Sequence, residues 1–138
     1  MLNSVVNSLW AGLPDLLGQY LTTAIIYAVG IWAYMRLTPY HELKLVRQGN
    51  LAAAITLAGA LVGLALPLGA TLAHSINILD IAIWGAISAA LQALSFGLAS
   101  LVLRDMPAAV ERGDVATAVV VASVQIGVGI LNAGAMSS

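Results

Sequence analysis

The sequence predicts an all-α membrane protein with four transmembrane helices. Four long stretches contain no Lys, Arg, Asp or Glu, and they are 16–35, 48–79, 81–103 and 115–138. A helix needs ~20 apolar residues to cross a hydrocarbon core of ~30 Å, so each stretch is long enough for one crossing. Only 8% of the residues are charged, whereas soluble domains carry about 25%. The hydrophobic fraction of 61% and the mean hydropathy of +0.98 indicate the same class.

The four crossings are expected at about 16–36, 51–73, 80–103 and 115–136. Four helices and short connections account for the whole length, so we expect a single membrane domain.

The first fourteen residues have a helical pattern of their own. Leu2, Val5, Leu9 and Leu13 recur at helical spacing, and Pro14 closes the run. This pattern favours a short helix that lies flat in the outer interface before the first crossing. A frayed terminus is the alternative.

The basic residues predict the orientation in the membrane. All five fall in two clusters between the hydrophobic stretches. Lys and Arg in short loops stay on the cytoplasmic side. The loops 37–50 and 104–114 are therefore expected inside, and both chain ends outside. The turn at 75–80 carries Asp80 and no basic residue, so it is expected outside as well.

The second half of the chain echoes the first. Arg36 ends the first helix, Pro39 follows it, and Asn50 opens the second helix. An Arg can anchor a helix end by reaching lipid phosphates, Pro stops a helix, and Asn or Asp caps the next one. The corresponding residues of the second half are Arg104, Pro107 and Asp114. The echo predicts two tandem hairpins of the same orientation, at about 16–73 and 80–136, related by an axis along the membrane normal.

A family resemblance rests on the start of the second helix. Residues 47–54 read RQGNLAAA, and Gly59 and Gly63 follow. This run resembles the YjfL-like family of bacterial inner-membrane proteins, whose even-numbered helices begin with Gly-Asn-x-Ala-x-Ala. The resemblance covers most of the chain and implies a four-helix inner-membrane protein with no assigned biochemistry. Its chain ends would then lie in the periplasm. The second half departs from the pattern at Asp114 and Thr117.

Small residues predict where helices pack. Gly59 and Gly63 stand four apart on the second helix, and Ser123 and Gly127 stand at the aligned places on the fourth. Such small-x3-small faces let membrane helices approach closely. We therefore expect the second and fourth helices to form an inner seam of the bundle or of an oligomer. Chance spacing in an Ala/Gly-rich chain is the alternative.

Polar side chains are expected deep in the membrane. Gln92 and Gln125 fall near the bilayer centre, with Ser88 and Ser95 on the face of the first and Asn132 on the face of the second. An unpaired amide in hydrocarbon costs several kcal/mol, so these faces should point inward. They either bond across helices, for ~0.6–2 kcal/mol each, or line a path for a small solute or ion. The spans lack the charged residue that marks ion pathways, which favours the first interpretation.

Several function classes are not expected. The chain has no Cys, and its two His have no metal-ligand partner at helical spacing, so we expect no enzyme, cofactor or metal site. A net charge of −1 does not suit nucleic acid. His74, close to Asp80, is either an acidity sensor or an interfacial residue in water.

The expected partners are the lipid bilayer, further copies of the chain and other membrane proteins. The sequence favours a structural or assembly component of the envelope that forms a homo-oligomer. The alternative is a small channel or transporter whose path is lined by Gln92, Gln125, Ser88, Ser95 and Asn132.

Overall fold

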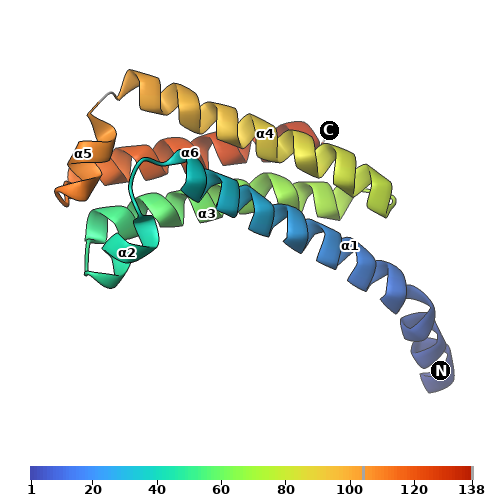
Figure 1. Cartoon of the computed structure of the whole chain (residues 1–138). Helices are drawn as coiled ribbons and strands as arrows, with labels where there is room; N and C mark the ends of the chain where they lie inside the picture. The colour runs from blue at the N-terminus through green and yellow to red at the C-terminus, as the bar shows by residue number, and fades with distance from the viewer. Residues whose placement is uncertain (104, 138) are drawn as a thin grey trace.

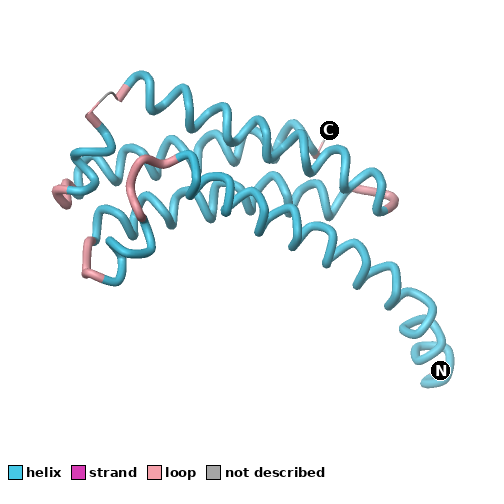
Figure 2. The backbone as a smooth tube through the Cα atoms, in the orientation of Figure 1, coloured by secondary structure: helices cyan, strands magenta, loops and turns pink. Residues whose placement is uncertain are grey.

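The computed structural model describes residues 1–103 and 105–137, and the part it describes consists of helices and short connections (Figures 1 and 2). The helices are α1 (Leu2–Leu37), α2 (Glu42–Arg47), α3 (Leu51–His74), α4 (Ile78–Val102), α5 (Met106–Glu111) and α6 (Val115–Met136). Four of them, α1, α3, α4 and α6, are long and apolar enough to cross a membrane. The predicted all-α class with four membrane helices is confirmed.

The bundle is built around α3 and α6. These two helices share the most extensive contact in the chain, although they belong to different halves of the sequence. Helix α4 packs against both of them, and α1 packs against α3 and α4. The buried side chains of α3 are mostly small, which allows its neighbours to approach closely.

Helix α1 is longer than predicted. It runs without a break from Leu2 to Leu37, with Pro14 inside it, so the expected helix end at Pro14 is wrong. Proline removes one helical hydrogen bond, the one to the carbonyl of Trp10, and Trp10 is exposed. An exposed carbonyl can find another partner, so the helix can bend instead of stopping. Its N-terminal part extends beyond the other helices (Figure 1). A position in the interface stays a prediction.

Both loops at one end of the bundle contain a short helix that the sequence did not predict. Helices α2 and α5 have six residues each. Pro107 was expected to stop the preceding helix. It is instead the second residue of α5, so it opens a helix. Proline fits the first helical turn because the N–H it lacks would have no helical partner there. We call this end, with α2 and α5, the loop end.

The two connections enter α3 and α6 in the same way. Gly49 and Gly113 have φ of 84° and 82°, a left-handed conformation that favours glycine. Asn50 and Asp114 follow as N-caps. Asn50 Oδ1 accepts from the Ala53 N–H at 3.1 Å, and Asp114 Oδ1 accepts from the Thr117 N–H at 3.2 Å. The predicted anchor Arg104 lies outside the described residues, and the repeat of whole hairpins stays a prediction.

Candidate functional site

The seam between α3 and α6 is a contact of backbone on backbone. A Cβ at Gly63 would lie 2.7 Å from the Gln125 carbonyl oxygen and 2.8 Å from Gln92 Nε2. A Cβ at Gly59 would collide with the Ala122 backbone, and one at Gly129 with the Gly63 backbone. The seam therefore has no room for a larger side chain at these three glycines.

The partner face on α6 differs from the predicted one. Ser123 is exposed, and its hydroxyl donates to the Val119 carbonyl of its own helix at 2.7 Å. A Cβ at Gly127 would meet nothing within 4 Å. The prediction that Ser123 and Gly127 form the seam within the bundle is thus wrong, and a seam of an oligomer at these residues stays a prediction. Each residue along a helix turns its side chain by about 100°, so the aligned positions of a repeat need not face the same neighbour.

Pro67 contributes to the seam from inside α3, where it is buried. The N–H that proline lacks would have bonded to the carbonyl four residues earlier, which is that of Gly63. This carbonyl faces Gly129 of α6, whose missing side chain lets the two backbones meet. A Cα–H can then approach the carbonyl oxygen, which partly replaces the missing helical bond.

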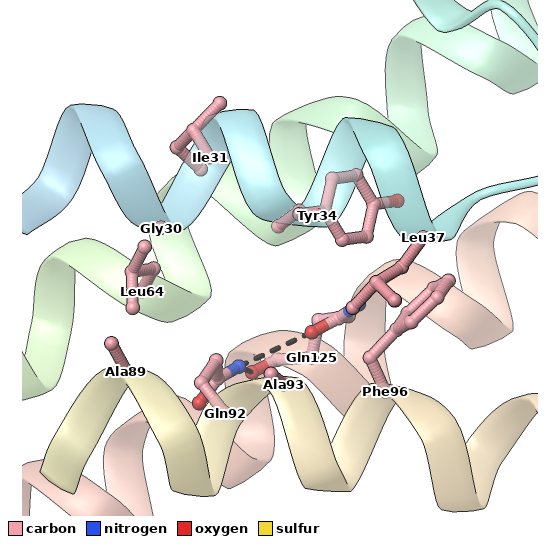
Figure 3. A pocket seen from close by; sticks show the side chains of 11 residues that line it. Gly30, Ile31, Tyr34, Leu37, Leu64, Ala89, Gln92, Ala93, Phe96 and Gln125 are labelled. Atoms are coloured by element: carbon pink, nitrogen blue, oxygen red, sulfur yellow. Dashed lines mark hydrogen bonds between the residues drawn. The ribbon is translucent and has the colours of Figure 1, made fainter. Parts of the chain in front are cut away.

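Buried amide side chains join α4 and α6. Gln92 Nε2 donates to the Gln125 backbone oxygen at 2.9 Å and to Gln125 Oε1 at 3.2 Å (Figure 3). Asn132 Nδ2 donates to the Ser88 carbonyl oxygen at 3.1 Å. All four residues are buried. Ser95 does not join them: it is only partly buried and donates to the Leu91 carbonyl of its own helix at 2.8 Å, so its predicted inward position is wrong.

The polar pairs are not fully satisfied. Gln92 Oε1, Gln125 Nε2, Ser88 Oγ and Asn132 Oδ1 are buried without a hydrogen-bond partner. The α4–α6 contact therefore carries polar atoms beyond those that take part in its three hydrogen bonds.

A mostly apolar pocket lies beside the glutamine pair. It encloses about 350 Å³, its open mouth included, between α1, α3 and α4. Gly30, Leu64 and Ala89 line it together with the edge-to-face pair of Tyr34 and Phe96, whose ring centroids are 4.8 Å apart (Figure 3). Its chemistry suits apolar contact, with the two amide side chains of Gln92 and Gln125 at its wall.

A second polar cluster, which the sequence reading missed, lies at the loop end. Glu42 of α2 is only 2% exposed. Three more residues are buried around it, namely Tyr34 of α1, Tyr40 of the loop before α2, and Thr56 of α3. Burial raises the pKa of Glu42 to about 7, although the two tyrosine hydroxyls act to lower it. Neither hydroxyl makes a well-formed hydrogen bond to the carboxyl. We call these four residues the Glu42 cluster.

The signal for this cluster in the sequence is weak. Glu42 stands in a short loop between His41 and Lys44, where a carboxylate is usually in water. Only the two nearby tyrosines, at positions 34 and 40, suggest a set of oxygens that could meet it.

The opposite end of the bundle carries His74. Its Nδ1 lies 2.9 Å from the Ala70 carbonyl oxygen, and it lines a pocket together with Thr71, Asp80 and Trp84. The predicted neighbours His74 and Asp80 thus share a pocket. Among the described residues no group of three or more His, Cys, Asp or Glu could hold a metal ion.

The extent of the chain that matches a known family decides its classification. The family described as Domain of Unknown Function (DUF350) matches residues 8–136. The chain belongs to this family. It is also similar to the UPF0719 inner membrane protein YjfL of Escherichia coli strain K12 and to its counterpart of the same name in Escherichia coli O157:H7. Each is 26% identical over 107 residues, which cover 78% of this chain and 81% of the relative.

These relatives confirm the resemblance to the YjfL-like family and the location in the inner membrane. No solved structure matches the chain. It is an inner-membrane protein of unknown function with four membrane-capable helices.

Proposed function

We propose that the chain is a structural component of the bacterial envelope, a helical scaffold that assembles with further copies of itself. The observation that carries this proposal is that the buried polar side chains form hydrogen bonds between helices. Gln92 bonds to Gln125 and Asn132 bonds to the Ser88 carbonyl, so these side chains hold α4 against α6. In hydrocarbon such bonds fix the register of helices whose apolar surfaces alone would not select it.

Self-association is supported by the surface of α1. In the most apolar 18-residue window of this helix, 0% of the residues are buried within one chain. Large side chains such as Trp10, Tyr20, Ile25 and Trp32 are exposed along it. A second copy that packs on this face would cover the side of α1 that a single chain leaves exposed.

The orientation that we propose places the loop end in the cytoplasm. The described basic residues Arg36, Lys44, Arg47 and Arg112 belong to this end, in or beside α2 and α5 or at the end of α1. The positive-inside rule then puts both chain ends in the periplasm. The turns before α3 and α6 share a left-handed glycine followed by an N-cap residue. This similarity supports two tandem hairpins of the same orientation.

A channel or transporter path is the less favoured function. The amides that would line it bond to each other across the α4–α6 contact, and Ser95 stands apart from them. A path through these residues would have to break the bonds that hold the helices.

Cysteine cross-linking tests self-association directly, because the chain has no native Cys. In native membranes we expect Ile25→Cys, on the exposed face of α1, to form a disulfide-linked dimer. Leu131→Cys, which is also exposed but lies on α6, is the matched control and should stay monomeric. Native mass spectrometry from lipid nanodiscs should show more than one chain per particle. A monomer by both methods would overturn the proposal.

Flux measurements in reconstituted vesicles test the second function. A solute or ion flux that is lost in Gln92→Leu would replace the scaffold with the channel. Flux equal to that of empty vesicles would leave the scaffold as the better account.

A further inference from the structure

The Glu42 cluster brings together buried oxygens that lack partners. Both carboxylate oxygens of Glu42 and the hydroxyls of Tyr34 and Tyr40 make no well-formed hydrogen bond, although the three groups lie close enough to interact. Thr56 lies beside Tyr40, and its hydroxyl proton is used in a bond to the Ala53 carbonyl at 3.0 Å. Its oxygen can therefore only accept or coordinate. Three elements, α1, α2 and α3, and the loop that carries Tyr40 deliver these oxygens to one place.

A buried carboxylate needs either a proton or a positive partner, because an isolated charge away from water is very costly. No side chain within the described part of the chain supplies one. Lys44 is exposed on the same short helix, and Arg36 stacks on the Trp32 ring, 5.2 Å from its centre. Neither enters the electrostatic surroundings that set the state of the Glu42 carboxyl, which are burial and the two tyrosines.

We propose that the oxygens of Glu42, Tyr34 and Tyr40 form a site for one desolvated alkali cation where α1, α2 and α3 meet. Carboxylate and hydroxyl oxygens are hard ligands that suit hard cations. The single negative charge of Glu42 matches a monovalent ion, whereas a divalent ion would leave a buried positive charge. The ion would give each orphaned oxygen a partner and neutralise the carboxylate.

Access to the site comes from the loop end. Glu42 and Tyr40 line a wide, open pocket between the end of α1 and α2, together with Thr38 and Met35. Arg36, His41 and Lys44 stand on the walls of the same pocket. Arg36 and Lys44 repel an entering cation, and this repulsion is screened over about 10 Å at ordinary ionic strength.

The test is equilibrium binding of radioactive ²²Na⁺ and ⁸⁶Rb⁺, the latter as a probe for K⁺, to the full chain in zwitterionic nanodiscs. The measurements are made at pH 8 in choline chloride at constant ionic strength. We expect saturable binding of about one ion per chain, and the two isotopes identify which alkali ion is preferred. Glu42→Gln should abolish binding. Tyr40→Phe, which keeps the ring in place, should weaken it about 10–100-fold, the range seen when a group supporting a metal site is lost.

Glu111→Gln is the matched control, since Glu111 is an exposed carboxylate in the equivalent short helix α5. It should bind as the unaltered chain does. Absence of saturable binding for both isotopes would overturn the site, and so would binding that survives both Glu42→Gln and Tyr40→Phe. A carboxyl that only takes up a proton gives the first of these results. The site is independent of self-association, so its failure leaves the scaffold untouched.

Discussion

Asn50 donates a hydrogen bond from Nδ2 to the carbonyl oxygen of Val110, at 2.9 Å, and so joins the first connection of the chain to the second. The same side chain caps α3 through its Oδ1. Asp114 holds the corresponding cap before α6, but its side chain has no N–H to donate. One residue of the pair thus ties the two halves together at the loop end, and the other only caps a helix.

This difference predicts that Asn50→Asp destabilises the chain although it keeps the cap. The carboxylate can still accept from the Ala53 N–H, but it would face the carbonyl oxygens of Val110 and Glu111. We expect a loss of about 1–3 kcal/mol in the free energy of unfolding, measured by SDS titration in mixed micelles. Asp114→Asn keeps its acceptor and is the control, with the smaller effect. Equal stability of Asn50→Asp and the unaltered chain would contradict the bridge.

The seam predicts opposite outcomes for two glycines of neighbouring helices. Gly63→Ala forces a methyl group against the Gln125 carbonyl and the Gln92 amide, so we expect a loss of about 1–3 kcal/mol in thermal or SDS unfolding. Gly127→Ala adds the same methyl group in open space on α6 and should be close to neutral. If both variants behaved alike, α3 and α6 would not be packed as described.

The glutamine pair predicts non-additive effects. Gln92→Leu removes both donor bonds to Gln125 and should cost about 0.6–2 kcal/mol. The single variant also leaves the buried Gln125 side chain without its partner. Gln92→Leu with Gln125→Leu should therefore cost less than the sum of the two single variants in a double-mutant cycle. Strict additivity would mean that the two amides do not interact in the membrane.

Glu42 predicts that stability falls as the pH rises. Burial raises its pKa from 4.5 to about 7, so between these values the folded chain holds a proton that the unfolded chain has released. Stability is then greatest below pH 4.5, declines up to about pH 7 and levels off above it. The whole decline amounts to at most about 3 kcal/mol.

Melting curves in choline buffers without alkali ions measure this decline. Glu42→Gln cannot titrate and should flatten the curve over the same interval. A wild-type profile that is retained by Glu42→Gln would assign the pH dependence to another group.

The elements that could be predicted from the sequence are those set by local physics. Hydropathy locates α3, α4 and α6 because a span is defined by its own residues. The caps at Asn50 and Asp114 follow from side chains that bond three residues ahead. Pro14 was misread because a proline stops a helix only where the freed carbonyl has no other partner, which depends on exposure.

The contacts between helices could be predicted only in part. Gly59 and Gly63 lie in the seam, but the matching face of α6 carries Ala122, Gln125 and Gly129. Which side of a helix meets its neighbour depends on the rotation of both helices, and the sequence of one half does not contain that information. The Glu42 cluster was missed although Tyr34, Tyr40 and Glu42 are close in sequence, because the burial of the carboxyl depends on how α2 packs against α3.

The tight pairing of α3 with α6 bears on the order in which the protein is made. Neither hairpin contains this pair, so α3 enters the bilayer well before its principal partner is synthesised. Until then the narrow glycine face of α3 is covered only by lipid or by the insertion machinery. The bundle core can therefore close only after α6, the last helix described, has been synthesised.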